Sequence, residues 1–209
     1  PFKNLLCQGM VNLDGKKMSK SRGNVVDPVT MINQYGADAA RAFVLFLGSP
    51  EKQVEWSDEG IEGMYQFLKR VYALVDGPTS EPHIPLPEPY VASKVQKTVQ
   101  SVTSFLESHR FHTALRDVME LQRLLAQYRG GRRTSYIQIL AQLITPFAPH
   151  LAEELWRKTR GAGLVSESDW PTPDPSKIND RQEYVYQKAL DIHRDIERIK
   201  ELTGIDNPS

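Results

Sequence analysis

Apolar side chains recur at helical spacing through most of this chain, and this periodicity constrains the fold more than any other feature. The clearest stretch follows Ser57-Asp58-Glu59, a sequence that suits the start of a helix. Apolar residues then return at steps of three, four and seven: Ile61, Met64, Tyr65, Leu68, Val71, Tyr72 and Val75. The pattern predicts a long amphipathic helix with one buried face.

The same pattern predicts four more long helices downstream and two short ones upstream. The downstream helices are expected over residues 91–106, 111–128, 134–145 and 149–156, with breaks at His109-Arg110, Gly130-Gly131 and Pro146. The upstream helices are expected from Asp27-Pro28 to Gly36 and over residues 37–47. A connector rich in proline, residues 77–89, is too proline-dense for helix. Helices joined by such short turns predict one bundle.

A final helix is predicted beyond the proline-rich stretch from Trp170 to Pro175. Asp180 and Glu183 stand at capping-box spacing, with Asp in place of the usual Ser or Thr. Apolar residues then alternate steps of four and three: Val185, Ala189, Ile192, Ile196 and Ile199. We expect this seam to pack on the bundle or on a partner segment.

The first residues of the chain follow a different pattern. Leu5 to Cys7 and Gly9 to Leu13 predict a short strand that runs into a loop from Asp14 to Gly23. Four cations lie in this loop: Lys16, Lys17, Lys20 and Arg22. Cations and hydroxyls between two glycines suit the binding of a polyphosphate, whereas the alternative is an ordinary solvated basic turn.

Composition excludes several classes of protein. Lys plus Arg and Asp plus Glu both number 26, so a uniformly basic coat for nucleic acid is excluded and any RNA contact must be local. The lone Cys7 excludes an internal disulfide and a cysteine-rich metal site, and we expect it to be a small buried apolar residue. No apolar run is long enough to cross a bilayer and no signal peptide opens the chain, so we expect a cytoplasmic protein.

Lys17-Met18-Ser19-Lys20-Ser21 spells the second active-site signature of the class I aminoacyl-tRNA synthetases, and the chain resembles this family over residues 1–171. Pro1 to Leu6 and Val54 to Gly60 resemble the leucyl branch in particular. Tyr35 to Arg41 is similar to the segment that joins the catalytic and helical domains, with Asp38 and Arg41 as orienting polar groups. Pro146 to Trp156, with Trp170-Pro171, resembles the end of the anticodon-binding bundle, where we expect His150, Trp156 and Trp170 to have structural roles.

The resemblance implies ligation of leucine to tRNA(Leu) by way of an adenylate, with ATP supplied together with Mg²⁺. It implies that Lys20 contacts the ATP phosphates, that Lys17 assists, and that Ser19 and Ser21 donate hydrogen bonds while Met18 anchors the loop. The residues 17–21 would thus bind ATP, and Lys17 and Lys20 would be catalytic. Negative charge grows on the departing pyrophosphate, and each cation aimed at it could supply roughly 2–4 kcal/mol. No metal site is expected in this chain itself.

Arginines concentrate between residues 110 and 133, where they outnumber acidic residues. We expect tRNA phosphates to bind at Arg116, Arg123, Arg129, Arg132 and Arg133. Arg116 and Arg123 share a helix face, and the other three surround the C-terminal turn of that helix. The alternative is that these side chains only compensate the helix dipole and are solvated.

Taken together, these patterns predict a mostly α chain, with an anticodon-binding-type bundle preceded by a small α/β remnant of the class I nucleotide-binding domain. We expect the end of the catalytic domain in residues 1–52, the bundle in 53–171, and a linker with a C-terminal helix in 172–209. The His-x-Gly-His signature of the family is absent and the chain begins with Pro1, so we expect a fragment that is inactive without an N-terminal catalytic half. The alternatives are a valyl or isoleucyl synthetase fragment, and a noncatalytic helical RNA-binding module.

Overall fold

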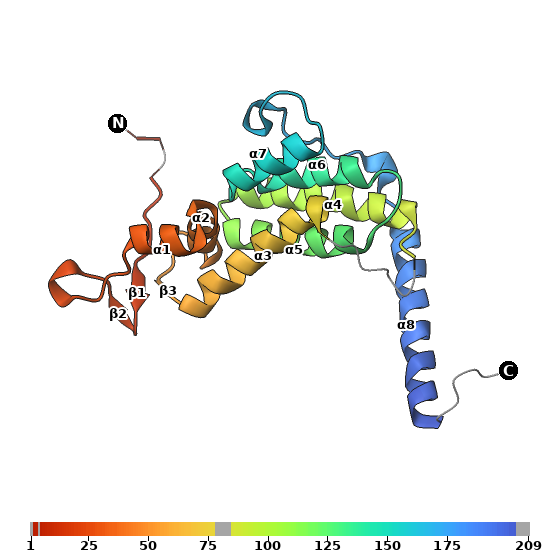
Figure 1. The fold of residues 1–209 in the computed structure, drawn as a ribbon, viewed down its shortest axis with the longest axis horizontal. Helices are drawn as coiled ribbons and strands as arrows, with labels where there is room; N and C mark the ends of the chain where they lie inside the picture. The colour runs from red at the N-terminus through yellow and green to blue at the C-terminus, as the bar shows by residue number, and fades with distance from the viewer. Residues whose placement is uncertain (1, 4, 78–84, 204–209) are drawn as a thin grey trace.

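The computed structural model describes residues 2, 3, 5–77 and 85–203 of the chain. Predictions that involve Pro1, Asn4, Pro78, Pro82 and Ile205 therefore lie outside the described residues. The described part is mostly helical, with one small sheet at its N-terminal end, which confirms the predicted fold class (Figure 1).

Eight α-helices lie within the described residues. They are α1 (Pro28–Tyr35), α2 (Ala37–Phe46), α3 (Asp58–Asp76), α4 (Glu88–Glu107), α5 (Phe111–Gln127), α6 (Arg133–Ile144), α7 (Pro149–Lys158) and α8 (Asp180–Thr203). Helix α4 begins inside the predicted connector, because Pro89 occupies its first turn, where a missing N–H costs nothing. The other helix boundaries lie within a few residues of those predicted.

Helices α2 to α7 share one hydrophobic core. From α3 it takes the predicted Ile61, Met64, Leu68 and Val71, and also Phe67 and Leu74. From α2 it takes Ala39, Ala42 and Phe43, so this helix belongs to the bundle although it lies near the N-terminal end of the chain. The tyrosines of α3 are only partly buried and lie at the edge of the core.

The small sheet has the strand order β2-β1-β3, with β1 (Val11–Leu13) in the centre. Strand β2 (Lys16–Lys17) returns antiparallel to β1, and Leu13 faces Lys16. Strand β3 (Val54–Glu55) pairs in parallel with β1 and comes from the segment before α3. The sheet therefore joins the N-terminal segment to the chain that enters the bundle.

The prediction for residues 5–7 was wrong. The strand covers only Val11–Leu13, so Leu5, Leu6 and Cys7 lie before the sheet rather than in it. All three side chains are exposed, and Cys7 is therefore not the buried apolar residue that was expected. An apolar run alone did not reveal that this segment lacks a second surface on which to pack.

The predicted capping box at the start of α8 was also wrong. Asn179 caps the helix instead, since its side-chain oxygen accepts a hydrogen bond from the backbone N–H of Gln182 at 3.1 Å. Asp180 and Glu183 are directed to α4, where both form ion pairs with Lys97. Glu183 also pairs with Lys94 at 2.8 Å. These contacts bind the first turn of α8 to the bundle.

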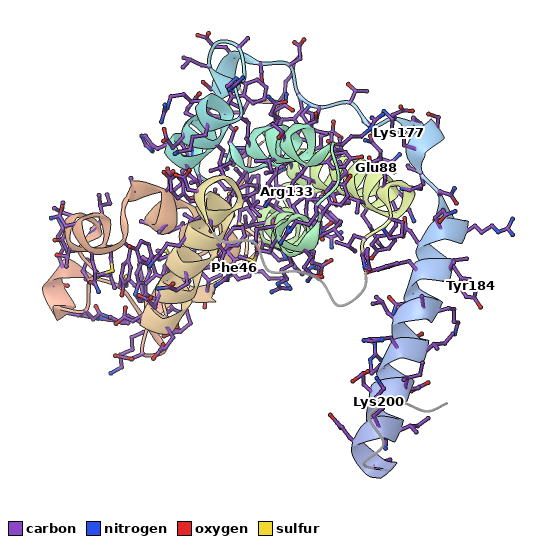
Figure 2. All side chains as sticks on the ribbon, turned by 45° about the vertical axis from the view of Figure 1, so that its right-hand side comes forward. Phe46, Glu88, Arg133, Lys177, Tyr184 and Lys200 are labelled. Atoms are coloured by element: carbon purple, nitrogen blue, oxygen red, sulfur yellow. The ribbon has the colours of Figure 1, made fainter. Side chains whose placement is uncertain are left out.

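Beyond the residues that contact the bundle, α8 extends away from it (Figure 1), and Figure 2 shows Tyr184 and Lys200 along its length. Tyr186 packs against Tyr90 of α4, with ring centroids 4.3 Å apart. The predicted apolar seam does not pack on the bundle, because Ile192, Ile196 and Ile199 are all exposed. Within the described residues, none of the helices combines the length and the apolar character needed to cross a bilayer.

Candidate phosphate-binding loop and RNA-facing surface

The basic loop begins as a tight hairpin. Asp14 and Gly15 connect β1 to β2, and both have positive φ angles, of 54° and 70°. Two consecutive positive φ angles are typical of two-residue hairpin turns, for which Asp-Gly is a favoured sequence. The N–H of Gly15 donates to Oε1 of Glu55 at 2.8 Å, so β3 also holds the turn. The start of the loop is therefore fixed by the sheet.

Asn24 closes the other end of the loop. Its Oδ1 accepts a hydrogen bond from the backbone N–H of Ser19 at 2.9 Å, and its Nδ2 donates to the carbonyl oxygen of Lys17 at 3.2 Å. Between these points Lys20–Arg22 form one turn of 3-10 helix, which ends at Gly23 with a φ of 68°. One side chain thus holds together residues up to seven positions apart.

The cations of this loop have no competing partners. Within the described part of the chain, no ion pair and no side-chain hydrogen bond is formed by Lys16, Lys17, Lys20 or Arg22. All four residues are exposed. Figure 1 shows the loop at the end of the molecule opposite α8, where it projects from the sheet. The cations are therefore free to bind an external anion.

The remaining residues of the signature shape the loop. The hydroxyl oxygens of Ser19 and Ser21 lie 2.8 Å apart, in hydrogen-bonding contact, which leaves one of the two protons available for another acceptor. Met18 is half-buried, and its N–H donates a long bond to the carbonyl oxygen of Val11 at 3.5 Å. The loop therefore has one face directed to the sheet and a polar face directed to solvent.

Asp27 connects the loop to α1. Its carboxylate accepts hydrogen bonds from the hydroxyl of Thr30 and from the backbone N–H groups of Val29 and Thr30. The bond from Thr30 and the bond from Val29 lower the pKa of Asp27 below its ordinary value. This cap at the N-terminus of α1 agrees with the prediction from Asp27-Pro28.

The predicted tRNA-binding arginines differ in their surroundings. Arg133 is half-buried and donates from a terminal nitrogen to the carbonyl oxygen of Leu74 at 2.7 Å, across the end of α3. Burial and the neighbouring Arg129 lower the pKa of Arg133. Figure 2 labels Arg133 in the middle of the bundle. Its role in this structure is to link helices.

The other four arginines are exposed. Arg116 lies 3.6 Å from Asp117, and Arg132 lies 3.5 Å from Glu88, so both form loose ion pairs. Arg129 donates to the carbonyl oxygen of Tyr128 at 2.9 Å, where it complements the end of α5. Arg123 forms no ion pair within the described residues. Of the predicted set, Arg123 is the most available to a phosphate.

Arg123 lies on a groove of about 370 Å³ between α4, α5 and α8. The tilted ring pair of Tyr90 and Tyr186 forms one wall, and Lys94 adds a second cation. Sequence analysis missed this groove because the packing of α8 on α4, which creates it, depends on contacts between distant residues. In the sequence, the signal for this packing was that Lys94 and Lys97 could pair with the acidic residues at the start of the last helix.

The three residues expected to be structural have structural contacts. His150 bonds to Asp38 on α2, as described below, while Nε1 of Trp156 donates to the carbonyl oxygen of Ala162 at 3.2 Å. Nε1 of Trp170 donates to the hydroxyl of Thr103 at 2.8 Å. None of the three side chains lies at the basic loop.

Two family models match different parts of the chain. Residues 88–208 match the anticodon-binding domain of tRNA ligase, and residues 1–57 match the tRNA synthetases class I (I, L, M and V). The boundary between the two models falls around α3. The basic loop and the groove thus belong to segments that match different models.

Curated relatives agree with these matches. The chain is 44% identical over 191 residues to a leucine–tRNA ligase of Syntrophobacter fumaroxidans, covering 82% of this chain and 23% of the relative. It is 39% identical to that of Pseudothermotoga lettingae (85% and 24%) and 38% identical to that of Geotalea daltonii (87% and 24%). The chain therefore spans about a quarter of the length of these relatives.

A solved structure shares the fold. It is the ternary complex of LeuRS of Agrobacterium radiobacter K84 with tRNA and LeuAMS. The TM-score is 0.71 at 32% identity, over 82% of this chain and 24% of that chain. The fold of most of this chain is thus similar to part of a LeuRS whose structure was solved with tRNA.

Proposed function

Because the chain belongs to the tRNA ligase family that carries this anticodon-binding domain, we propose that it works as a section of a leucine–tRNA ligase. In this role the basic loop stabilises the pyrophosphate that leaves ATP as leucyl-adenylate forms. The bundle holds tRNA(Leu), and the remaining three-quarters of the ligase provides the leucine pocket and the rest of the catalytic site. The ligase would act in the cytoplasm.

One observation carries the proposal: the loop cations are exposed and have no ion-pair partner among the described residues, although the backbone that carries them is fixed at both ends. Asn24 closes the loop, and the hairpin turn is bonded to β3. A basic turn that is merely solvated would need neither the bonds of Asn24 nor the bond between the hairpin turn and β3. Groups held ready where charge develops stabilise a transition state without reorganisation, which is what loss of pyrophosphate requires.

We assign the individual roles as follows. Lys20 contacts the phosphates and Lys17 assists, while Met18, Ser19 and Ser21 complete the ATP-binding segment. ATP enters as its Mg²⁺ complex, so the metal arrives with the substrate. Gly15 and Gly23 both have positive φ and stand at the two ends of the loop, which would move as one preformed unit when it closes over ATP and reopens for product release.

For tRNA we propose phosphate contacts along the exposed arginines. Arg123 contributes first, the exposed Arg116, Arg129 and Arg132 add to it, and Arg133 supports the surface from inside. Phosphate contacts position an RNA without reading its bases, which suits a bundle that offers cations on helices and few exposed aromatic side chains. The expected division into residues 1–52, 53–171 and 172–209 assigns the ATP loop, this surface and α8 to different units, although α2 of the first unit packs in the core of the second.

The test is a pair of lysine substitutions in the complete ligase. Lys16 and Lys17 are neighbours on a strand, so their side chains point to opposite faces, and Lys16 is a matched exposed cation of the same hairpin. We expect Lys20→Ala to slow leucine-dependent pyrophosphate exchange by roughly 100-fold or more, and Lys16→Ala to change it little.

Both variants should bind tRNA(Leu) as the parent does, because neither residue lies on the bundle. Equal rates of exchange for Lys20→Ala and the parent would refute the role of the loop. Exchange that depends on valine or isoleucine instead of leucine would assign the ligase to another branch of the family.

A further inference from the structure

Helix α7 is capped by a residue from another helix. It starts at Pro149, and its own N-cap residue, Ala148, has no side chain that can accept a hydrogen bond. Asp38 of α2 fills this role: its carboxylate accepts from the N–H of Leu151 at 2.7 Å and from the N–H of His150 at 3.4 Å. The same carboxylate lies 2.8 Å from Nδ1 of His150. A negative charge at this position also complements the helix dipole.

Arg41 provides a second contact from the same face of α2. It lies one turn after Asp38, and its Nε donates to the carbonyl oxygen of Pro146 at 3.1 Å. The carboxylate thus binds the free N–H groups that follow the turn between α6 and α7, while the guanidinium binds a carbonyl oxygen within that turn. We call Asp38 and Arg41 the clasp.

The clasp lies next to the joint that carries the basic loop. Gly36 connects α1 to α2, with φ 86° and ψ 157°, a conformation that residues with a side chain rarely adopt. Of the buried residues of α2, Phe43 makes an edge contact with Trp56, whereas Ala39 and Ala42 offer only methyl groups with little interlocking shape. Directional hydrogen bonds, unlike methyl contacts, fix a helix against rotation and sliding. The side chain of Asp38 is 14% exposed and therefore well shielded from water.

We propose that the clasp of Asp38 and Arg41 sets the direction in which α1 and the basic loop leave the bundle, so that tRNA on the bundle and ATP at the loop are held in register. This inference rests on the proposed function for its consequence in catalysis. Asp38 and Arg41 are positioning residues, since they touch other helices and lie apart from the loop. The edge contact of Tyr35 with Tyr65, at 5.8 Å between ring centroids, supports α1 from α3 but bears no directional polar bond.

The first test measures direction in this chain alone. Spin labels are placed at Asn33→Cys on α1 and Glu120→Cys on α5, both exposed, in a Cys7→Ser background. We expect Asp38→Asn with Arg41→Gln to broaden the distance distribution between the labels at least two-fold. Arg41→Gln alone should broaden it too, which keeps the test decisive if the Asp38 variant does not fold. An unchanged distribution in a folded variant would overturn the proposal.

Glu153→Gln is the matched control. Glu153 is a carboxylate on α7 that accepts from the N–H groups of Val165 and Ser166 and from the Ser166 hydroxyl, so it makes as many bonds as Asp38 but none to α2. Its loss should lower stability without broadening the distribution between labels on α1 and α5. Broadening of equal size in this control would also overturn the proposal, because it would show a general loosening of α7.

The second test separates positioning from stability in the complete ligase. With rates expressed per active site, Asp38→Asn should lower kcat/KM for tRNA(Leu) roughly 10-fold or more. Leucine-dependent pyrophosphate exchange, which needs no tRNA, should stay within about two-fold. Arg41→Lys, which can still donate to Pro146, should restore part of the loss seen with Arg41→Gln. A parallel fall of both activities would contradict the clasp, whereas normal exchange in Lys20→Ala would contradict the proposed function instead.

Discussion

The side-chain oxygen of Asn24 lies 2.9 Å from the backbone nitrogen of Ser19, so the residue after the basic loop holds the middle of that loop in place. The same amide group bonds to the carbonyl oxygen of Lys17. A side chain that makes both bonds must be both acceptor and donor, which an amide can be and a carboxylate cannot.

We expect Asn24→Ala to loosen the loop. In the complete ligase this should slow leucine-dependent pyrophosphate exchange by roughly 10-fold, because the cations must then be ordered at each turnover. Asn24→Asp should behave similarly, since it cannot donate to Lys17. Asn33→Ala, an exposed asparagine on α1, is the control and should change nothing. An Asn24→Ala ligase with the parent rate would show that the bonds of Asn24 are irrelevant to chemistry.

The groove cation Arg123 offers a test of tRNA binding. We expect Arg123→Gln to weaken tRNA(Leu) binding and to lower the slope of log K against log salt by about one, the effect of losing one phosphate contact. Thermal stability should not change, because the side chain has no protein partner within the described residues. Glu120→Gln, also on the groove, removes a negative charge and should leave binding equal or tighter. An unchanged salt slope for Arg123→Gln would exclude this contact.

Substitutions of Arg133 and Arg132 should show that the half-buried contact of Arg133 contributes more to stability than the exposed charge of Arg132. Arg133 donates to Leu74 from a half-buried position, so Arg133→Ala should lower the free energy of unfolding by about 2 kcal/mol. Arg132 has an exposed side chain in a 3.5 Å pair with Glu88, and Arg132→Ala should cost less than about 1 kcal/mol. Urea unfolding of both variants measures the difference. Equal losses would mean that the link between α6 and α3 contributes nothing.

The ion pairs of Glu183 make the attachment of α8 dependent on pH. Burial raises the pKa of Glu183, but hydrogen bonds from Lys94, Ser93 and Lys97 outweigh it and lower the pKa to about 2. Because the folded-state pKa lies below the ordinary value of 4.5, the stabilisation is complete above about pH 4.5 and is lost as the pH falls toward 2. Its full size is at most about 3 kcal/mol.

Urea unfolding at pH 7 and pH 3 should therefore show a smaller loss of stability for Glu183→Gln than for the parent. Glu154→Gln is the control, since Glu154 pairs with Arg157 within one exposed turn of α7. If the parent and Glu183→Gln lost equal stability between the two pH values, the carboxylate of Glu183 would have no role in holding α8.

Local signals predicted most of the fold. Asp27-Pro28 located α1, and the apolar spacing from Ile61 to Val71 located α3, because each depends on residues within a few turns of one another. The basic loop was recognised from its five signature residues. These features need no knowledge of distant neighbours.

What the sequence did not reveal depends on contacts between distant segments. Asp180 was read as a cap because it stands three residues before Glu183, yet both side chains are drawn to lysines of α4 that lie more than eighty residues earlier. Likewise Cys7 looked apolar enough to be buried, but its side chain is exposed in the part of the chain that the structure describes. The availability of Arg123 and the commitment of Arg133 could only be distinguished once α3 and α8 were in place.

The central position of β1 in its sheet has a consequence for dissecting the protein. Strand β2, on one side of β1, precedes α1 in the chain, and strand β3, on the other side, follows α2. Helix α2 itself covers α3 and α5 with Ala39, Ala42 and Phe43. A truncated chain that begins at Ser57 would lack α2, and the apolar surface of α3 and α5 that α2 covers would be exposed to water. A shortened chain that keeps the bundle folded must therefore begin before α2, and β1 is paired on both sides only if it keeps both the basic hairpin and the segment that leads into α3.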